Sequence, residues 1–102
     1  MNQKKRVYID LENARHDVCI VQENIELLKK TLKHLIDMEH FMEDNNLDSL
    51  GETTLTELRD TISYTNKCYQ TNKDYYKHYS LKVLKLKLDV KDANRRNVFD
   101  YF

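Results

Sequence analysis

The sequence contains no proline and a single glycine, Gly51, among its 102 residues. Proline breaks helices and glycine weakens them, so almost nothing in this chain interrupts a helix. Tryptophan is also absent, and the two cysteines, Cys19 and Cys68, are too few for a framework of disulfides. These absences exclude a small disulfide-stapled domain and favour one domain built from long helices.

The sequence also lacks a run of about 18 apolar residues, so we expect no membrane span. The first residues are basic, but only residues 7–9 are apolar before Asp10. A secretory signal peptide needs an apolar stretch of about 7–15 residues. We therefore expect a cytoplasmic protein with two free thiols and no cleaved signal peptide. Export by a secretion system that recognises a folded pair of helices stays an alternative.

What the sequence does contain is a hydrophobic repeat with alternating spacings of three and four residues, which runs twice. The members of the repeat are Leu11, Ala14, Val18, Val21, Ile25, Leu28, Leu32, Leu35 and Met42, then Leu55, Leu58, Ile62, Thr65, Tyr69, Asn72, Tyr76, Tyr79, Val83, Leu86, Val90 and Ala93. This spacing places each run on one stripe of a helix and is typical of a coiled-coil seam. We therefore predict an all-α, coiled-coil-like fold, an antiparallel two-helix hairpin that forms one domain over residues 1–102.

The boundaries of the two helices follow from capping residues. We expect an extended start at residues 7–9, an N-cap at Asp10 and a first helix over residues 10–44. Asn45 and Asn46 favour the helix end, and residues 45–53 form the turn. Thr54 and Glu57 have the spacing of a capping box, which predicts a second helix over residues 54–96. More than three quarters of the chain should be helical, against about one third in ordinary domains.

Large apolar residues also lie outside the seam, where one antiparallel helix cannot cover them. They could broaden the core and leave a few side chains exposed, or they could bind a second pair of helices in a four-helix bundle. We favour the second interpretation, with a homodimer when the protein is isolated and a larger helical partner in the cell. The predicted partner-binding residues are Ile20, Leu27, Phe41, Leu81, Leu84, Leu88, Tyr64 and Tyr75.

Charge is segregated along the chain although the net charge is zero. Residues 37–60 contain eight acids and one base, whereas residues 67–96 contain nine bases and three acids. The hairpin would bring Lys4, Lys5, Arg95 and Arg96 to one end. This basic end predicts a contact with an acidic partner, and nucleic acid stays an alternative because phosphate binding needs clustered Lys and Arg.

Few residues are candidates for metal binding or catalysis. His16, Cys19 and His78 could converge on zinc, but their spacing is not that of a known zinc finger, and we expect no metal site. The chain has no glycine-rich phosphate loop and no nucleophile elbow. We therefore expect neither a cofactor nor an enzymatic activity.

The long helix, the mid-chain turn containing Gly51 and the second long helix together resemble one family. These are the small helical-hairpin proteins of Gram-positive type VII secretion, namely the Trp-x-Gly family and the helper proteins that pair with LXG toxins. The chain has Ser49, Leu50 and Gly51 where that family has its Trp-x-Gly turn. The resemblance implies a helper or chaperone-type adaptor that pairs with the helices of a larger effector. Two alternatives stay open: a phage or mobile-element protein that inhibits a host factor by binding it, and a small dimeric nucleic-acid-associated protein.

Overall fold

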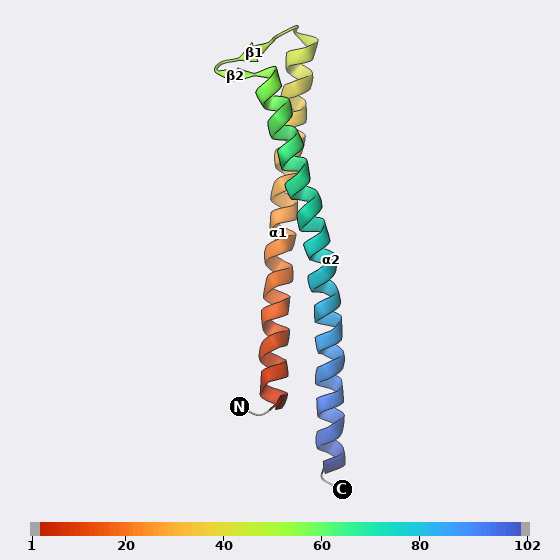
Figure 1. Cartoon of the computed structure of the whole chain (residues 1–102). Helices are drawn as coiled ribbons and strands as arrows, with labels where there is room; N and C mark the ends of the chain where they lie inside the picture. The colour runs from red at the N-terminus through yellow and green to blue at the C-terminus, as the bar shows by residue number, and fades with distance from the viewer. Residues whose placement is uncertain (1–2, 101–102) are drawn as a thin grey trace. The chain divides into compact units, whose positions relative to one another are not determined.

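Two long helices make up nearly all of this protein (Figure 1). A computed structural model describes the backbone of residues 3–100 and the side chains of residues 5–94. Helix α1 covers Gln3–Asp44, 42 residues, and helix α2 covers Leu55–Asp100, 46 residues. The two helices pack against each other as a helical hairpin. The predicted all-α hairpin and the predicted helix content above three quarters are both confirmed.

The hairpin divides into two compact units, and each contains a part of both helices. Unit 1 combines the part of α1 that ends at Gln22 with the part of α2 that begins at Asp74. Unit 2 is the continuous segment Glu23–Lys73, which includes the connection between the helices. The buried side chains of unit 1 are Leu11, Ala14 and Val21, and those of unit 2 are Met42, Leu58 and Thr65. All six are members of the predicted seam.

Helix α1 begins earlier than the sequence predicted. Residues 7–9, expected to be extended before an N-cap at Asp10, are helical. Val7 is half-buried one turn before the buried Leu11, so it extends the seam toward the N-terminus. The Tyr8 hydroxyl group donates a hydrogen bond to Oδ1 of Asn94 on α2, at 3.4 Å. These contacts with α2 outweigh the weak local preference of β-branched residues for an extended chain. Helix α2 likewise continues beyond the predicted residue 96 to Asp100.

The end of α1 is set by a Schellman motif. The Leu47 N–H donates to the Met42 carbonyl group at 2.8 Å, and the Asn46 N–H donates to the Glu43 carbonyl group at 3.2 Å. Asn46 has a φ angle of 52°, in the left-handed region that asparagine tolerates better than most residues. The predicted helix end at the asparagine pair is therefore correct, and these bonds satisfy carbonyl groups that the helix itself leaves free.

The connection contains a small β-hairpin that the sequence did not indicate. Strand β1, Ser49–Leu50, pairs antiparallel with strand β2, Thr53–Thr54. Gly51 has a φ angle of 63°, as the first central residue of a type II′ turn requires. The Leu55 N–H also donates to the Asp48 carbonyl group at 2.8 Å, which closes the base of the hairpin. The only glycine therefore lies at a position where a side chain would strain the backbone.

The predicted capping box at the start of α2 is present. The Glu57 N–H donates to Oγ1 of Thr54 at 3.1 Å, and the Thr54 N–H donates to Oε2 of Glu57 at 3.4 Å. These reciprocal bonds satisfy two backbone amides at the helix start.

Replacing Thr54 by alanine is therefore expected to lower the free energy of unfolding by about 1 kcal/mol, because the Glu57 amide loses its acceptor. Urea unfolding followed by circular dichroism measures this loss. Thr56→Ala, two residues further on and without a capping bond, is the matched control and should have little effect. Equal losses in the two variants would show that the cap does not stabilise α2.

The polar members of the seam make their hydrogen bonds within α2. Oγ1 of Thr65 donates to the Thr61 carbonyl group at 2.7 Å, and Nδ2 of Asn72 donates to the Cys68 carbonyl group at 2.8 Å. Thr65 is buried and Asn72 is half-buried. One seam position departs from the prediction, because Tyr76 is exposed.

Candidate protein-interaction surfaces

All eight residues predicted to bind a partner are exposed. Their exposed fractions range from 43% for Ile20 to 70% for Tyr64. Unit 1 carries Ile20, Tyr75, Leu81, Leu84 and Leu88, and unit 2 carries Leu27, Phe41 and Tyr64. Leu81, Leu84 and Leu88 follow one another at spacings of three and four, so they form one stripe on α2. Soluble monomers seldom leave apolar stripes of this kind open to water.

Unit 1 also has an apolar groove, which the sequence did not indicate. The groove has a volume of about 500 Å³ and is lined by Arg15, Val18, Cys19, Ser80, Val83, Leu84 and Lys87. Four of these residues (Val18, Cys19, Ser80 and Val83) have small side chains, and they come from both helices. Facing small side chains leave space between the helices, which accounts for the groove. Only Leu84 among them was predicted to contact a partner.

The groove has an apolar floor and a basic rim. Val83 and Val18 are half-buried within it, whereas Arg15 and Lys87 are exposed. Nη1 of Arg15 lies 3.3 Å from Oε1 of Glu12, and both side chains are at least half exposed. An ion pair so open to water contributes little free energy, so Arg15 can exchange it for another carboxylate.

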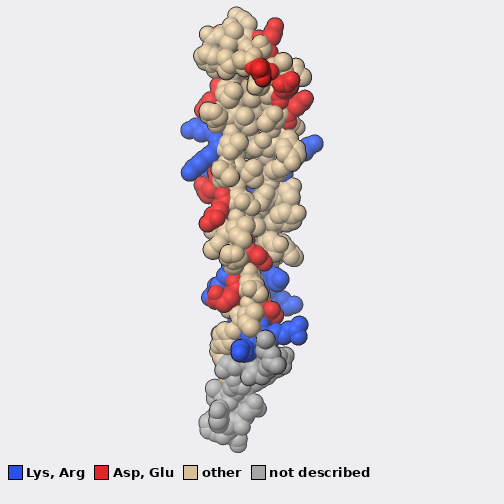
Figure 2. Space-filling model, turned by 90° about the vertical axis from the view of Figure 1, so that its left-hand side faces the viewer, with Lys and Arg blue, Asp and Glu red and all other residues tan. Residues whose placement is uncertain are grey.

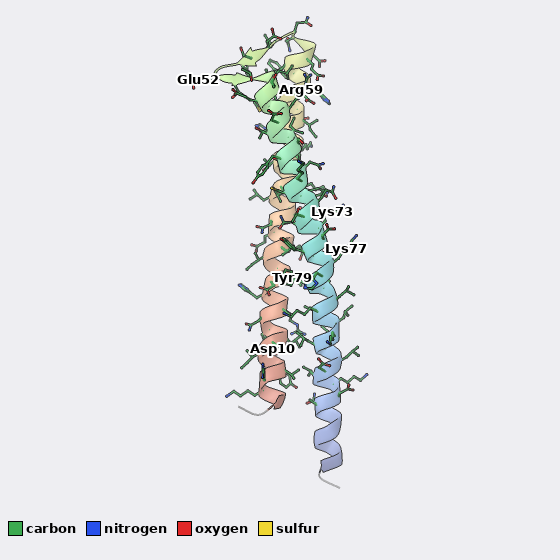
Figure 3. All side chains as sticks on the ribbon, in the orientation of Figure 1. Asp10, Glu52, Arg59, Lys73, Lys77 and Tyr79 are labelled. Carbon is green, nitrogen blue, oxygen red and sulfur yellow. The ribbon has the colours of Figure 1, made fainter. Side chains whose placement is uncertain are left out.

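A charged cluster links the two helices of unit 2 near the connection. Nη2 of Arg59 lies 2.9 Å from Oε1 of Glu43, and Nε of Arg59 lies 3.3 Å from Oε2 of Glu39. Arg59, labelled in Figure 3, is on α2, and both glutamates are on α1. The hydrogen bond to Glu43, with that to Glu39, raises the pKa of Arg59 above its ordinary value. Through these two ion pairs Arg59 joins the two helices.

Acidic side chains otherwise dominate this part of unit 2. Figure 2 shows Asp and Glu gathered on the visible face toward the connection. By sequence, unit 2 has ten acidic and six basic residues, a net charge of −4. The remaining residues have eleven bases and seven acids, a net charge of +4. Opposite charges on the two units favour the approach of complementary surfaces.

The predicted basic end is described only in part. Lys5 is exposed. The side chains of Lys4, Arg95 and Arg96 lie outside the described residues, so the predicted contact with an acidic partner or with nucleic acid stays a prediction.

The tyrosines of α2 divide between the surface and the helix interface. Tyr64 and Tyr75 are exposed, whereas Tyr69 and Tyr79 are half-buried. The Tyr75 and Tyr79 rings have centroids 6.4 Å apart, and the His78 ring meets the Tyr79 ring edge-on at 5.4 Å. Nζ of Lys73 lies 5.2 Å from the centroid of the Tyr69 ring, a cation–π contact. These contacts order the aromatic side chains on α2.

The side chains of residues 5–94 offer no ready-made site for a metal. Both cysteines are free thiols, as predicted, with Cys19 exposed and Cys68 half-buried. Within the side chains that the structure describes, no three His, Cys, Asp or Glu residues are grouped to hold a metal ion. His16, Cys19 and His78 therefore do not form the zinc site that their spacing left possible. Over the same residues, neither helix has a stretch long and apolar enough to cross a membrane.

Comparison with protein-family models, with curated proteins and with solved structures gives no match for this chain.

Proposed function

We propose that this protein is a non-enzymatic interaction module that packs the exposed faces of its helices against helices of a partner. The observation that carries this proposal is the exposure of large apolar side chains on both units. Burying one such side chain contributes about 1.5–3 kcal/mol, so an uncovered set favours association. Helices that project apolar side chains at three- and four-residue spacing are suited to a helical partner.

For the isolated protein we propose a homodimer in which two hairpins form a four-helix bundle. In the cell we propose that a larger helical protein replaces the second copy, with this chain as its helper or chaperone-type adaptor. The resemblance to helical hairpins of type VII secretion supports a secretion effector as that larger protein. A two-helix hairpin leaves one face of each helix open, and a second pair of helices completes the core.

The test of this proposal uses Leu27→Glu combined with Phe41→Glu. Both side chains are exposed, so the variant should keep its helical circular dichroism while losing association, because two charges now replace the apolar contacts. Sedimentation equilibrium of wild type and variant at micromolar concentrations measures the dimer. The matched control is Gln22→Glu combined with His40→Glu, which adds the same two negative charges at exposed positions of α1 outside the apolar set. A wild-type protein that stays monomeric and captures no partner from its host would contradict the proposal.

A further inference from the structure

The groove of unit 1 has features that specify the chemistry of its occupant. Its floor is apolar, and its rim carries Arg15 and Lys87. Among the described residues, Arg15 forms an ion pair with Glu12 alone, and Lys87 forms none. The occupant should therefore present an apolar side chain with carboxylates beside it. A volume of about 500 Å³ falls within the ~300–1,000 Å³ of typical binding pockets and leaves room for an aromatic ring.

Unit 2 carries a side chain with these properties. Phe41 is 52% exposed on α1. Asp37 lies four residues before it and Asp44 three residues after it, so both carboxylates share its face of the helix. Both aspartates are exposed, and neither forms an ion pair with a described residue. We call Asp37, Phe41 and Asp44 the acidic knob.

The last turn of α1 holds the acidic knob in place. The Phe41 carbonyl group accepts hydrogen bonds from the Asn45 N–H at 3.1 Å and from Nδ2 of Asn45 at 2.8 Å. These bonds and the Schellman motif that follows fix the backbone on which Phe41 and Asp44 are carried. A preorganised knob loses little conformational entropy on binding.

We propose that the groove of one copy receives the acidic knob of a second copy, with Phe41 on the apolar floor and Asp37 and Asp44 beside Arg15 and Lys87. This inference rests on the proposed association and names its contact. The charges of −4 on unit 2 and +4 on the rest of the chain favour this pairing over contacts between like units. In the proposed dimer the contact is reciprocal, so that the groove of each copy receives the knob of the other about a two-fold axis.

Charge reversal with rescue tests the contact on the full-length chain. One variant carries Arg15→Glu and Lys87→Glu in the groove rim, and the other carries Asp37→Lys and Asp44→Lys in the knob. Each variant alone places like charges across both contacts, and its dimer should weaken at least about tenfold in sedimentation equilibrium. In a mixture, each groove meets a knob of opposite charge, and the heterodimer should regain wild-type affinity within about threefold. Lys85→Glu, exposed on α2 but not in the groove lining, is the control and should change little.

A cross-link gives an independent measurement, because Cys19 lies in the groove lining. With Cys68→Ser in both chains, a chain that keeps Cys19 is mixed with a chain carrying Cys19→Ser and Phe41→Cys. Copper phenanthroline supplies the oxidant that takes two electrons and two protons from the thiols to form the disulfide. A disulfide needs Cα atoms within about 7 Å, so a linked heterodimer on a non-reducing gel supports the contact. His40→Cys, on the neighbouring face of α1, should link far less.

The outcomes separate this inference from the proposed function. The knob-in-groove contact would be overturned if the wild-type protein dimerised but the charge reversals left the affinity unchanged. It would also be overturned if Cys19 in the dimer reacted with maleimide as fast as in the monomer. In that case association would use another face, and the groove would serve a different occupant. A wild-type protein without any association would overturn both.

Discussion

Replacing Leu58 by alanine is expected to lower the free energy of unfolding by about 2–5 kcal/mol, a large share of the ~5–15 kcal/mol of a typical domain. Leu58 is 2% exposed in unit 2, where Met42 on α1 is fully buried. The surrounding side chains relax only partly after such a substitution, so a cavity adds to the loss of apolar burial. Urea unfolding followed by circular dichroism, extrapolated to zero protein concentration, measures the loss.

Leu81→Ala provides the control for this prediction, because Leu81 is 67% exposed on α2. Its removal should change the stability of the isolated chain by less than about 0.5 kcal/mol. If Leu81→Ala cost as much as Leu58→Ala, the assignment of the seam would be wrong.

The second large effect is expected at Ala14 in unit 1. Ala14 is 1% exposed, and aspartate at this position would bury a short charged side chain without a partner. We expect Ala14→Asp to lower the free energy of unfolding by at least about 3 kcal/mol. The neighbouring Asn13 is exposed, so Asn13→Asp introduces the same carboxylate at the surface and should have little effect.

Hydrogen exchange in the Ala14→Asp variant also tests whether the two units open together. Local opening confined to unit 1 would speed amide exchange there and leave the amides of unit 2 protected. A loss of protection in both units to the same extent would show one cooperative structure. Unchanged exchange and unchanged stability would contradict the burial of Ala14.

Sequence alone could predict the seam, the end of α1 and the capping box of α2. The spacing of three and four residues alone determines which face of a helix a side chain lies on. Leu11, Met42 and Leu58 were therefore correctly assigned to the interface. The start of α1 was missed because only the local conformational preference of residues 7–9 was considered. The hydrogen bond between Tyr8 and Asn94 joins residues 86 positions apart and could not be seen locally. The pairing of β1 with β2 was missed because two-residue strands are too short to show a period-two pattern.

The candidate interaction surfaces could be predicted only where large side chains form them. Exposed residues such as Leu27 and Leu88 fall outside the seam in the sequence, and the structure leaves them uncovered. The groove depends instead on small side chains. Cys19 and Ser80 line it, and their small size leaves space between the helices. Pairing residues whose numbers add to about 98, as a turn near position 49 implies, sets Cys19 against Tyr79, the neighbour of Ser80. That signal was in the sequence, but hydrophobic periodicity does not report it.

The hydrogen bonds donated by Thr65 and Asn72 have a consequence for protein engineering. Both bonds end on carbonyl groups of α2 itself, so sliding α2 along α1 by one heptad would keep them. The alignment of the helices in unit 2 then depends on the Arg59 ion pairs with Glu39 and Glu43 and on the connection, through the Schellman motif, the Gly51 turn and the Leu55–Asp48 hydrogen bond. Exchanging residues 46–53 for a flexible Gly–Ser linker would keep the chain connected but remove the constraints that the connection supplies. The connection is therefore the part to preserve when the two helices are grafted onto another scaffold.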